Sequence, residues 1–224
     1  LLSKTGSKTN MQNTIPVTIL VRDVDEGPEL VPSVKHIRVK EGQPVGTLIY
    51  TCTAKDPETK SGDGISYSKQ SDPSSWVNIS PTCQITTAKV LDREADEIKG
   101  KGEYNVTILA TDQSGKTGTG ILIITVDDEN DNDPVITSIG NHFCLPKRSL
   151  TIVAADADDV PNSSPLKFSL DDRTNPNIQS QWRIAQIDGT SASLEDIANQ
   201  PVGTYYVPIS IVDQQGKGTT HTIR

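Results

Sequence analysis

Residues 126–134 read VDDENDNDP, so only Asp, Glu and Asn lie between an apolar residue and a proline. Two carboxylates about 4 Å apart repel each other by roughly 4 kcal/mol at an effective dielectric constant near 20. Such a segment cannot enter a hydrophobic core, and it is either a solvated acidic turn or a cation site. We favour a calcium site, because Ca²⁺ takes about six to eight oxygens from carboxylates, amides and carbonyls.

The composition of the 224-residue chain argues against several classes of protein. It has 29 acidic and 21 basic residues, a net charge of −8 and no run of more than two Lys or Arg residues. Nucleic acid and anionic membranes are therefore poor partners. The three cysteines form no C-x-x-C pair and no histidine lies in a nucleophile motif, so neither a zinc site nor an enzyme is indicated.

Short runs rich in Val, Ile, Thr and Tyr alternate with Gly, Pro, Asn and Asp along the chain, a pattern typical of an all-β sandwich. In 103–110 (EYNVTILA) apolar and polar side chains alternate, which predicts one buried face and one exposed face that carries Asn105. The pattern predicts strands at residues 15–22, 34–39, 47–54, 65–69, 84–87, 103–110, 119–126 and 205–212.

An internal repeat divides the chain. AKDPE at 54–58 recurs as AADAD at 154–158, and DQSGK at 112–116 recurs as DQQGK at 213–217. Trp76 and Trp182 also occupy matching positions, which favours packing roles for both. We therefore predict two tandem sandwiches, 29–133 and 134–224, joined at the acidic stretch. Residues 1–28 are interpreted as the last hairpin and linker of an upstream domain.

Five motifs of this chain, taken in order, resemble those of the extracellular cadherin repeat. They are E-G (41–42), A-x-D-x-E/D (54–58 and 154–158), L-D-R-E (91–94), D-Q-x-G (112–115 and 213–216) and D-x-N-D-N-x-P (128–134). The resemblance covers nearly the whole chain. It implies an all-β fold of tandem seven-stranded Greek-key sandwiches in a linear rod, stiffened by Ca²⁺ at each junction. The stretches 23–29, 56–59, 182–194 and 202–209 resemble desmosomal cadherins, the desmocollin type more than the desmoglein type.

The resemblance also implies two sets of calcium ligands. The upstream set lacks usual side-chain donors at Val24 and Gly27, so we expect that site to be weak or empty. The central junction would use Glu41, Asp92, Glu94, Asp128, Glu129, Asn130, Asp131, Asn132, Asp156, Asp158 and Asp213, with Asn130 and Asn132 acting partly through main-chain carbonyls. The partial upstream junction would use Asp23, Asp25, Glu26, Asp56, Glu58 and Asp112.

The second repeat has no E-G motif after Pro134 and no L-D-R-E. By resemblance it is therefore expected to be the membrane-proximal repeat, anchored through a segment beyond this sequence. The implied function is calcium-dependent cell–cell adhesion, with these repeats as a spacer on the extracellular side of the plasma membrane at the desmosome, a cell junction. The implied partners are other cadherin ectodomains, bound homophilically or as desmocollin–desmoglein pairs through distal repeats.

Two further features fit a secreted chain. Sequons at Asn78, Asn105 and Asn162 are candidate glycosylation sites. Cys52 and Cys83 could form a disulfide in an oxidising compartment, or remain a buried thiol and a turn thiol. The resemblance implies that Cys144 pairs with a cysteine beyond Arg224.

Two other interpretations were weighed. A calcium-stabilised carbohydrate-binding sandwich of a secreted protein would need an exposed aromatic platform, for which the sequence offers little. Asp92 and Glu94 could also be interpreted as the two catalytic carboxylates of a glycosidase. However, two carboxylates on one loop suit a shared cation better than an acid and a nucleophile about 5 Å apart across a cleft.

Overall fold

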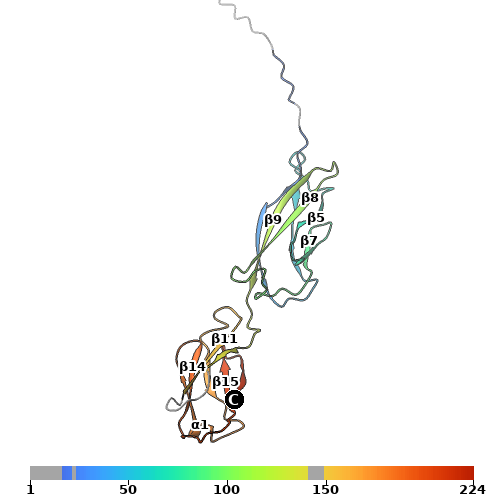
Figure 1. Cartoon of the computed structure of the whole chain (residues 1–224). Helices are drawn as coiled ribbons and strands as arrows, with labels where there is room; N and C mark the ends of the chain where they lie inside the picture. The colour runs from blue at the N-terminus through green and yellow to red at the C-terminus, as the bar shows by residue number, and fades with distance from the viewer. Residues whose placement is uncertain (1–16, 22–23, 141–148) are drawn as a thin grey trace, which may run out of the picture.

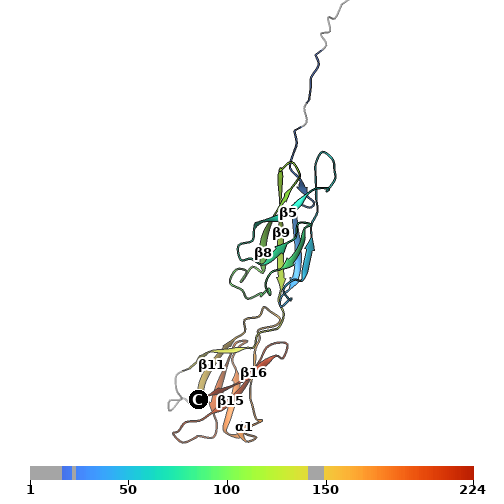
Figure 2. The ribbon, with the colours of Figure 1, turned by 90° about the vertical axis from the view of Figure 1, so that its right-hand side faces the viewer.

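The computed structural model describes residues 17–21, 24–140 and 149–224. Two β-sandwiches lie end to end in an elongated molecule, and residues 128–134 run between them (Figure 1, and turned by 90° in Figure 2). The predicted all-β fold is confirmed, and the helix found in the described residues is the single turn α1 (Ile178–Gln181). No helix within these residues is long and apolar enough to cross a membrane.

The first sandwich packs a four-stranded sheet against a three-stranded one, with a short two-stranded sheet beside them. The four-stranded sheet has the order β2 (Val34–Lys40), β9 (Thr117–Asp127), β8 (Glu103–Thr111) and β5 (Ser66–Ser71). The three-stranded sheet has the order β3 (Leu48–Thr51), β7 (Gln84–Thr87) and β6 (Val77–Ile79), and β1 (Glu29–Leu30) pairs with β4 (Ala54–Lys55). Strands β2 and β9 are parallel, whereas the other pairs in this sandwich are antiparallel.

The core of the first sandwich follows the predicted alternation on β8. Every second side chain from Tyr104 to Ala110 is buried, namely Tyr104, Val106, Ile108 and Ala110, and Asn105 is exposed on the other face. Trp76 is fully buried and stacks on the Tyr104 ring, with 4.2 Å between ring centroids. Its predicted packing role is confirmed.

The second sandwich also has a four-stranded and a three-stranded sheet, but its first strand pairs antiparallel with the next strand of the chain instead of parallel with the last one. One sheet has the order β10 (Val135–Ile139), β11 (Ser149–Ala155), β14 (Ser191–Asp196) and β13 (Trp182–Gln186). The other has the order β12 (Lys167–Leu170), β15 (Val207–Val212) and β16 (Gly218–Ile223). Trp182 is buried and meets Tyr205 edge-on at 5.7 Å, which confirms its packing role as well.

Two strand predictions need correction. Residues 17–21, the described part of the predicted strand 15–22, form no strand and expose their apolar side chains. A strand requires a partner backbone, and the described chain provides none there. The predicted strand 47–54 is broken after Thr51, because the chain changes partner from β7 to β1. Strands β1 and β6 of the first repeat were not predicted, and in the second repeat only residues 205–212 were predicted as a strand.

A disulfide joins Cys52 to Cys83, with 5.3 Å between their Cα atoms. It links the end of β3 to the turn before β7, and both cysteines are buried. Cys83 has a φ of 58°, in the region that glycine favours. The disulfide alternative left open by the sequence is therefore the one that the fold adopts, whereas Cys144 lies outside the described residues.

Reducing this disulfide is expected to destabilise the first sandwich by about 2 to 4 kcal/mol, because the bond closes a loop with a sequence separation of 31. Denaturant unfolding with and without a phosphine reductant measures the difference. The variant Cys52→Ala/Cys83→Ala should be insensitive to the reductant. An equal midpoint for the oxidised and reduced wild-type protein would contradict the expectation.

Candidate calcium-binding junction

The parallel pairing of β2 with β9 places Glu41 beside the linker. Lys40 is in register with Asp127, so both strands end at the same edge of the sheet. Glu41 follows directly and is only 4% exposed. Its carboxylate accepts hydrogen bonds from the backbone N–H of Arg93 at 2.7 Å and of Glu129 at 2.6 Å. Glu41 thus ties the loop 91–94 to the linker.

Carboxylates from three parts of the chain meet at this edge. Oxygens of Glu41, Asp92 and Glu94 lie within 4.8 Å of one another, and so do oxygens of Glu94, Asp128 and Asp158. Glu94 belongs to both groups. The two groups therefore connect the first sandwich, the linker and the second sandwich through carboxylate oxygens alone, the ligand type that Ca²⁺ prefers.

The electrostatics of these groups favour a cation. Burial, the neighbouring Glu41 carboxylate and a hydrogen bond with Asp92 raise the pKa of Glu94 to about 8. Burial is also the main cause that raises the pKa values of Glu41, Asp156 and Asp158. Desolvation and like charge both disfavour an ionised carboxyl group, so a bound cation would relieve both penalties.

Two buried oxygens at the junction have no hydrogen-bond partner, Oδ1 of Asn130 and Oδ2 of Asp156. Buried polar atoms in folded proteins are nearly always paired. The amide nitrogen of Asn130 donates to Asp213 at 2.6 Å, and Asp213 is fully buried. Hydrogen bonds from Asn130 and from the backbone of its own turn outweigh burial and lower the pKa of Asp213, which favours its charged form. A cation that binds oxygen ligands fits these two unpaired oxygens and the charged carboxylate of Asp213 beside them.

The amide of Asn132 lies where carboxylates converge. Its Nδ2 donates to Asp158 at 2.7 Å, to Asp131 at 2.8 Å and to Glu94 at 3.5 Å. Glu129 turns its side chain away, because its carboxylate pairs with Lys40 at 2.5 Å. The structure therefore brings the predicted central residues to one junction, with the Glu129 side chain directed to a lysine.

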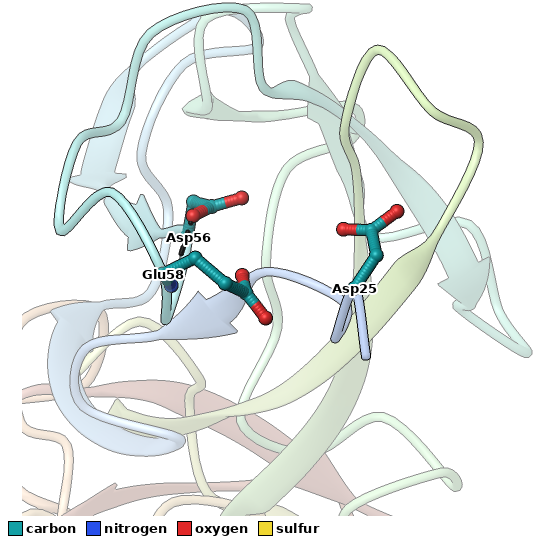
Figure 3. Close-up of side chains that lie close together, drawn as sticks. All are labelled: Asp25, Asp56 and Glu58. Atoms are coloured by element: carbon teal, nitrogen blue, oxygen red, sulfur yellow. Dashed lines mark hydrogen bonds between the residues drawn. The ribbon is translucent and has the colours of Figure 1, made fainter. Parts of the chain in front are cut away.

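The upstream set is only partly assembled in the described residues. Oxygens of Asp25, Asp56 and Glu58 lie within 4.8 Å of one another, and Figure 3 shows the three side chains around a common space. Glu58 also accepts a hydrogen bond from the Glu26 backbone N–H at 2.9 Å. Oδ2 of Asp112 is buried without a partner. Asp23 lies outside the described residues, so the expected weakness of this site stays a prediction.

Comparison with known proteins identifies the family. Residues 35–127 match the family described as "Cadherin domain". The chain is 41% identical to human desmocollin-2 over 223 residues, which is 99% of this chain and 24% of that protein. It is 37% identical to human desmocollin-3 over 95% of this chain and 24% of the relative. The chain belongs to the cadherin family.

Solved structures agree with this assignment. The human desmocollin-1 ectodomain superimposes on the cadherin chain with a TM-score of 0.75 and 34% identity, covering 90% of this chain and 37% of that one. Mouse cadherin-23 repeats 22–24 superimpose with a TM-score of 0.63 and 25% identity, over 85% of this chain and 61% of that one. The cadherin chain spans about a quarter of the length of the curated relatives it matches, 24% for desmocollin-2.

Reasoning from the sequence missed several residues of this cadherin junction. Arg93 pairs with Asp159, and Lys217 donates to the main-chain carbonyl of Asn130 at 3.2 Å. Their sequence signals were slight: Arg93 lies inside L-D-R-E, Asp159 follows D-A-D and Lys217 follows D-Q-Q-G. Nothing in those motifs indicates that a positively charged side chain also faces the acidic groups.

The candidate glycosylation sites differ in accessibility. Asn78 on β6 and Asn105 on β8 are exposed, as a glycan requires. Asn162 is half-buried, and its Nδ2 donates to Oδ2 of Asp128 at 2.8 Å. A glycan on Asn162 would lie against the cadherin linker, so this sequon has a structural use that the other two lack.

Proposed function

We propose that residues 29–133 and 134–224 are consecutive cadherin repeats of a calcium-dependent adhesion protein, with residues 1–28 as the end of an upstream repeat and its linker. The observation that carries the proposal is the meeting of carboxylates from both sandwiches and the linker around Glu94. The unpaired oxygens of Asn130 and Asp156 support it, as does the family.

The proposed mechanism is electrostatic. Without a cation, the carboxylates around Glu94 repel one another and favour separation of the two repeats. Bound Ca²⁺ would supply the counter-charge and share oxygens from both repeats, which holds the rod straight. Extracellular calcium modules have dissociation constants of about 10⁻⁴ to 10⁻³ M, so millimolar calcium would keep the junction rigid. The donors are those predicted from the sequence for the central junction.

The wider assignment rests on the desmocollin relatives. We place the protein on the extracellular side of the plasma membrane at a desmosomal cell junction, where its distal repeats would bind other cadherin ectodomains. The lack of L-D-R-E and E-G motifs in the second repeat supports a membrane-proximal spacer. We expect no enzymatic activity. Burial of both tryptophans argues against the carbohydrate-binding alternative.

Calcium is expected to protect the linker from a protease that cuts after glutamate, since Glu129 would be held between the two repeats. Asp131→Ala should weaken this protection, because the exposed Asp131 carboxylate adds negative charge beside Glu41 and binds Asn132. Time-resolved cleavage and small-angle X-ray scattering, each with calcium and with chelator, measure the effect.

The matched control is Asp63→Ala, an exposed aspartate of the first repeat whose carboxylate binds only Ser61 among the described residues. It should behave like the wild type. Cleavage after Glu129 at the same rate with and without calcium, together with an unchanged scattering profile, would exclude a calcium-stiffened junction.

A further inference from the structure

We propose that an N-glycan on Asn105 covers an apolar strip on the outer face of the first repeat and stabilises this repeat by packing against Ile121 and Ile123. The outer strip consists of Val34, Leu109, Ile121 and Ile123, on the solvent side of the four-stranded sheet. Such a contact is separate from the calcium junction. It rests on the extracellular location proposed above, since N-glycans are attached in the secretory pathway.

The outer strip is contiguous across three strands. Ile121 of β9 pairs with Val34 of β2 on one side and with Thr107 of β8 on the other. Val34 is 46% exposed and Ile121 42% exposed, whereas Ile123 and Leu109 are half-buried. Single exposed apolar side chains are common on soluble proteins, but neighbouring ones on one face indicate a surface that makes a further contact.

The sequon Asn105-Val106-Thr107 lies within this strip. Asn105 pairs directly with Ile123, and Thr107 pairs directly with Ile121. Directly opposed residues of an antiparallel pair have Cβ atoms about 4.5–5.5 Å apart, on the same face of the sheet. A sugar attached to Asn105 therefore begins beside Ile123, with Ile121 at the next diagonal position.

The chemistry of the attached sugar suits this surface. In the described part of the chain no other group hydrogen-bonds to the exposed carboxamide of Asn105, so its Nδ2 is free to carry a sugar. Transfer from a lipid-linked oligosaccharide forms the bond from Nδ2 to C1 of N-acetylglucosamine, breaks the bond from C1 to the donor diphosphate and releases one amide proton. The ring C–H groups and the N-acetyl methyl can then lie on the isoleucines while the hydroxyls stay in water.

A second copy of the chain fits this face less well than a glycan does. Two sheets pack closely only when nothing bulky projects from their faces. Asn105 lies at the edge of the exposed isoleucines, and a glycan attached there would hold another sheet away from them. The position of the sequon thus selects the sugar as the occupant of the outer strip.

Hydrogen exchange of the whole chain, followed by mass spectrometry, tests the glycan contact. The proteins are secreted from cultured animal cells behind a signal peptide. The variants are Asn105→Gln, Ile121→Thr/Ile123→Thr and the triple variant, since threonine suits a strand as isoleucine does. The readout is the exchange rate of the slowest amides of β9, which contains no sequon and exchanges when the first repeat opens.

The matched control is Asn78→Gln. Asn78 is an exposed sequon of the same repeat, but its cross-strand partner is Thr86 rather than an isoleucine. This change should alter the exchange of β9 by less than about twofold. Wild type from the bacterial periplasm, which carries Asn105 unmodified, separates loss of the sugar from the change of side chain and should exchange like Asn105→Gln.

Asn105→Gln is expected to raise the exchange rate of β9 by about 3- to 10-fold, the effect of uncovering part of one or two isoleucines. In the Ile121→Thr/Ile123→Thr background the same change should raise it by less than about twofold, because the contact is already absent. Coupling of this kind distinguishes packing from a general solubilising effect of the glycan.

Three results would overturn the proposal. One is an unmodified Asn105 in the secreted protein, and another is an equal increase in exchange in both backgrounds. The third is a glycosylated wild type that dimerises in sedimentation velocity and loses the dimer in Ile121→Thr/Ile123→Thr, because a second copy would then occupy the strip. Calcium is held constant and no proposed calcium ligand is changed, so this proposal and the calcium junction can fail separately.

Discussion

Replacing Glu94 with glutamine is expected to weaken calcium binding at the junction by about 10- to 100-fold, the range seen when a group that supports a metal site is removed. Glu94 belongs to both acidic groups of the junction, so its loss reduces the negative charge of each. Glutamine keeps the shape of the side chain and one carbonyl oxygen. The change therefore tests charge rather than packing.

Calorimetric titration with CaCl₂ measures this effect. The matched control is Glu97→Gln, which changes an exposed glutamate three residues further on that pairs with Lys89. The control should bind calcium as the wild type does. Wild-type affinity in Glu94→Gln would show that the junction does not bind calcium through this carboxylate.

In chelator, Glu94→Gln is expected to unfold no earlier than the wild type. Burial and the neighbouring Glu41 already disfavour the charged carboxylate, as the raised pKa of Glu94 shows. A neutral amide removes that penalty. Thermal unfolding in chelator therefore separates loss of binding from loss of folding, since a misfolded variant would melt at a lower temperature.

Asp72→Ala is expected to destabilise the first repeat by about 3 to 5 kcal/mol, as the loss of one partner from a buried charge network does. The Asp72 side chain is only 2% exposed. It accepts hydrogen bonds from the backbone N–H groups of Trp76 and Val77, from the Tyr104 hydroxyl and from the Lys69 ammonium. Alanine would leave all four donors without this partner.

The same network predicts that the stability of the first repeat depends on pH. Burial raises the pKa of Asp72, but the hydrogen bonds from Lys69 and Tyr104 and from two backbone N–H groups outweigh it and hold the pKa below its usual value. A lowered folded-state pKa stabilises the fold above the unfolded value of about 3.9, and this stabilisation is lost as the pH falls through the folded value.

Denaturant unfolding of wild type and Asp72→Ala at pH 7 and at about pH 3 measures both effects. The difference between the two proteins should shrink at the lower pH. Asp63→Ala, on the exposed surface, should change stability by no more than about 0.5 kcal/mol. A difference that grew on acidification would contradict the assigned network.

Local patterns in the sequence were enough to predict most strands of the first repeat. Alternation on β8 gave its buried face correctly, because every second side chain of that strand, from Tyr104 to Ala110, lies in the hydrophobic core. The break after Thr51 could not be predicted this way. There the Cys52 backbone N–H donates to the Cys83 carbonyl, whereas the Thr53 carbonyl accepts a hydrogen bond from the Val31 backbone N–H. The strand ends because its partners change, and those partners lie far away in the sequence.

The candidate site was likewise predicted from the sequence only in part. Its acidic residues were found because carboxylates cluster in motifs, and the family resemblance ordered them into one junction. The ion pair between Arg93 and Asp159 was not predicted, because the two residues lie 66 positions apart and neither is unusual where it stands. Asn162 was interpreted only as a sequon. A side chain that pairs across a junction leaves no local pattern, so only the fold reveals it.

The parallel pairing of β2 with β9 also decides how the first repeat responds to a pulling force. The chain reaches β2 at the upstream end and leaves through β9 into the linker, and the pairs run from Val34 with Ile121 to Lys40 with Asp127. Stretching the rod would pull the start of β2 and the end of β9 in opposite directions. The hydrogen bonds between them are then sheared together rather than opened one after another. The strand pair that places Glu41 beside the linker is thus also the part of the repeat that resists extension.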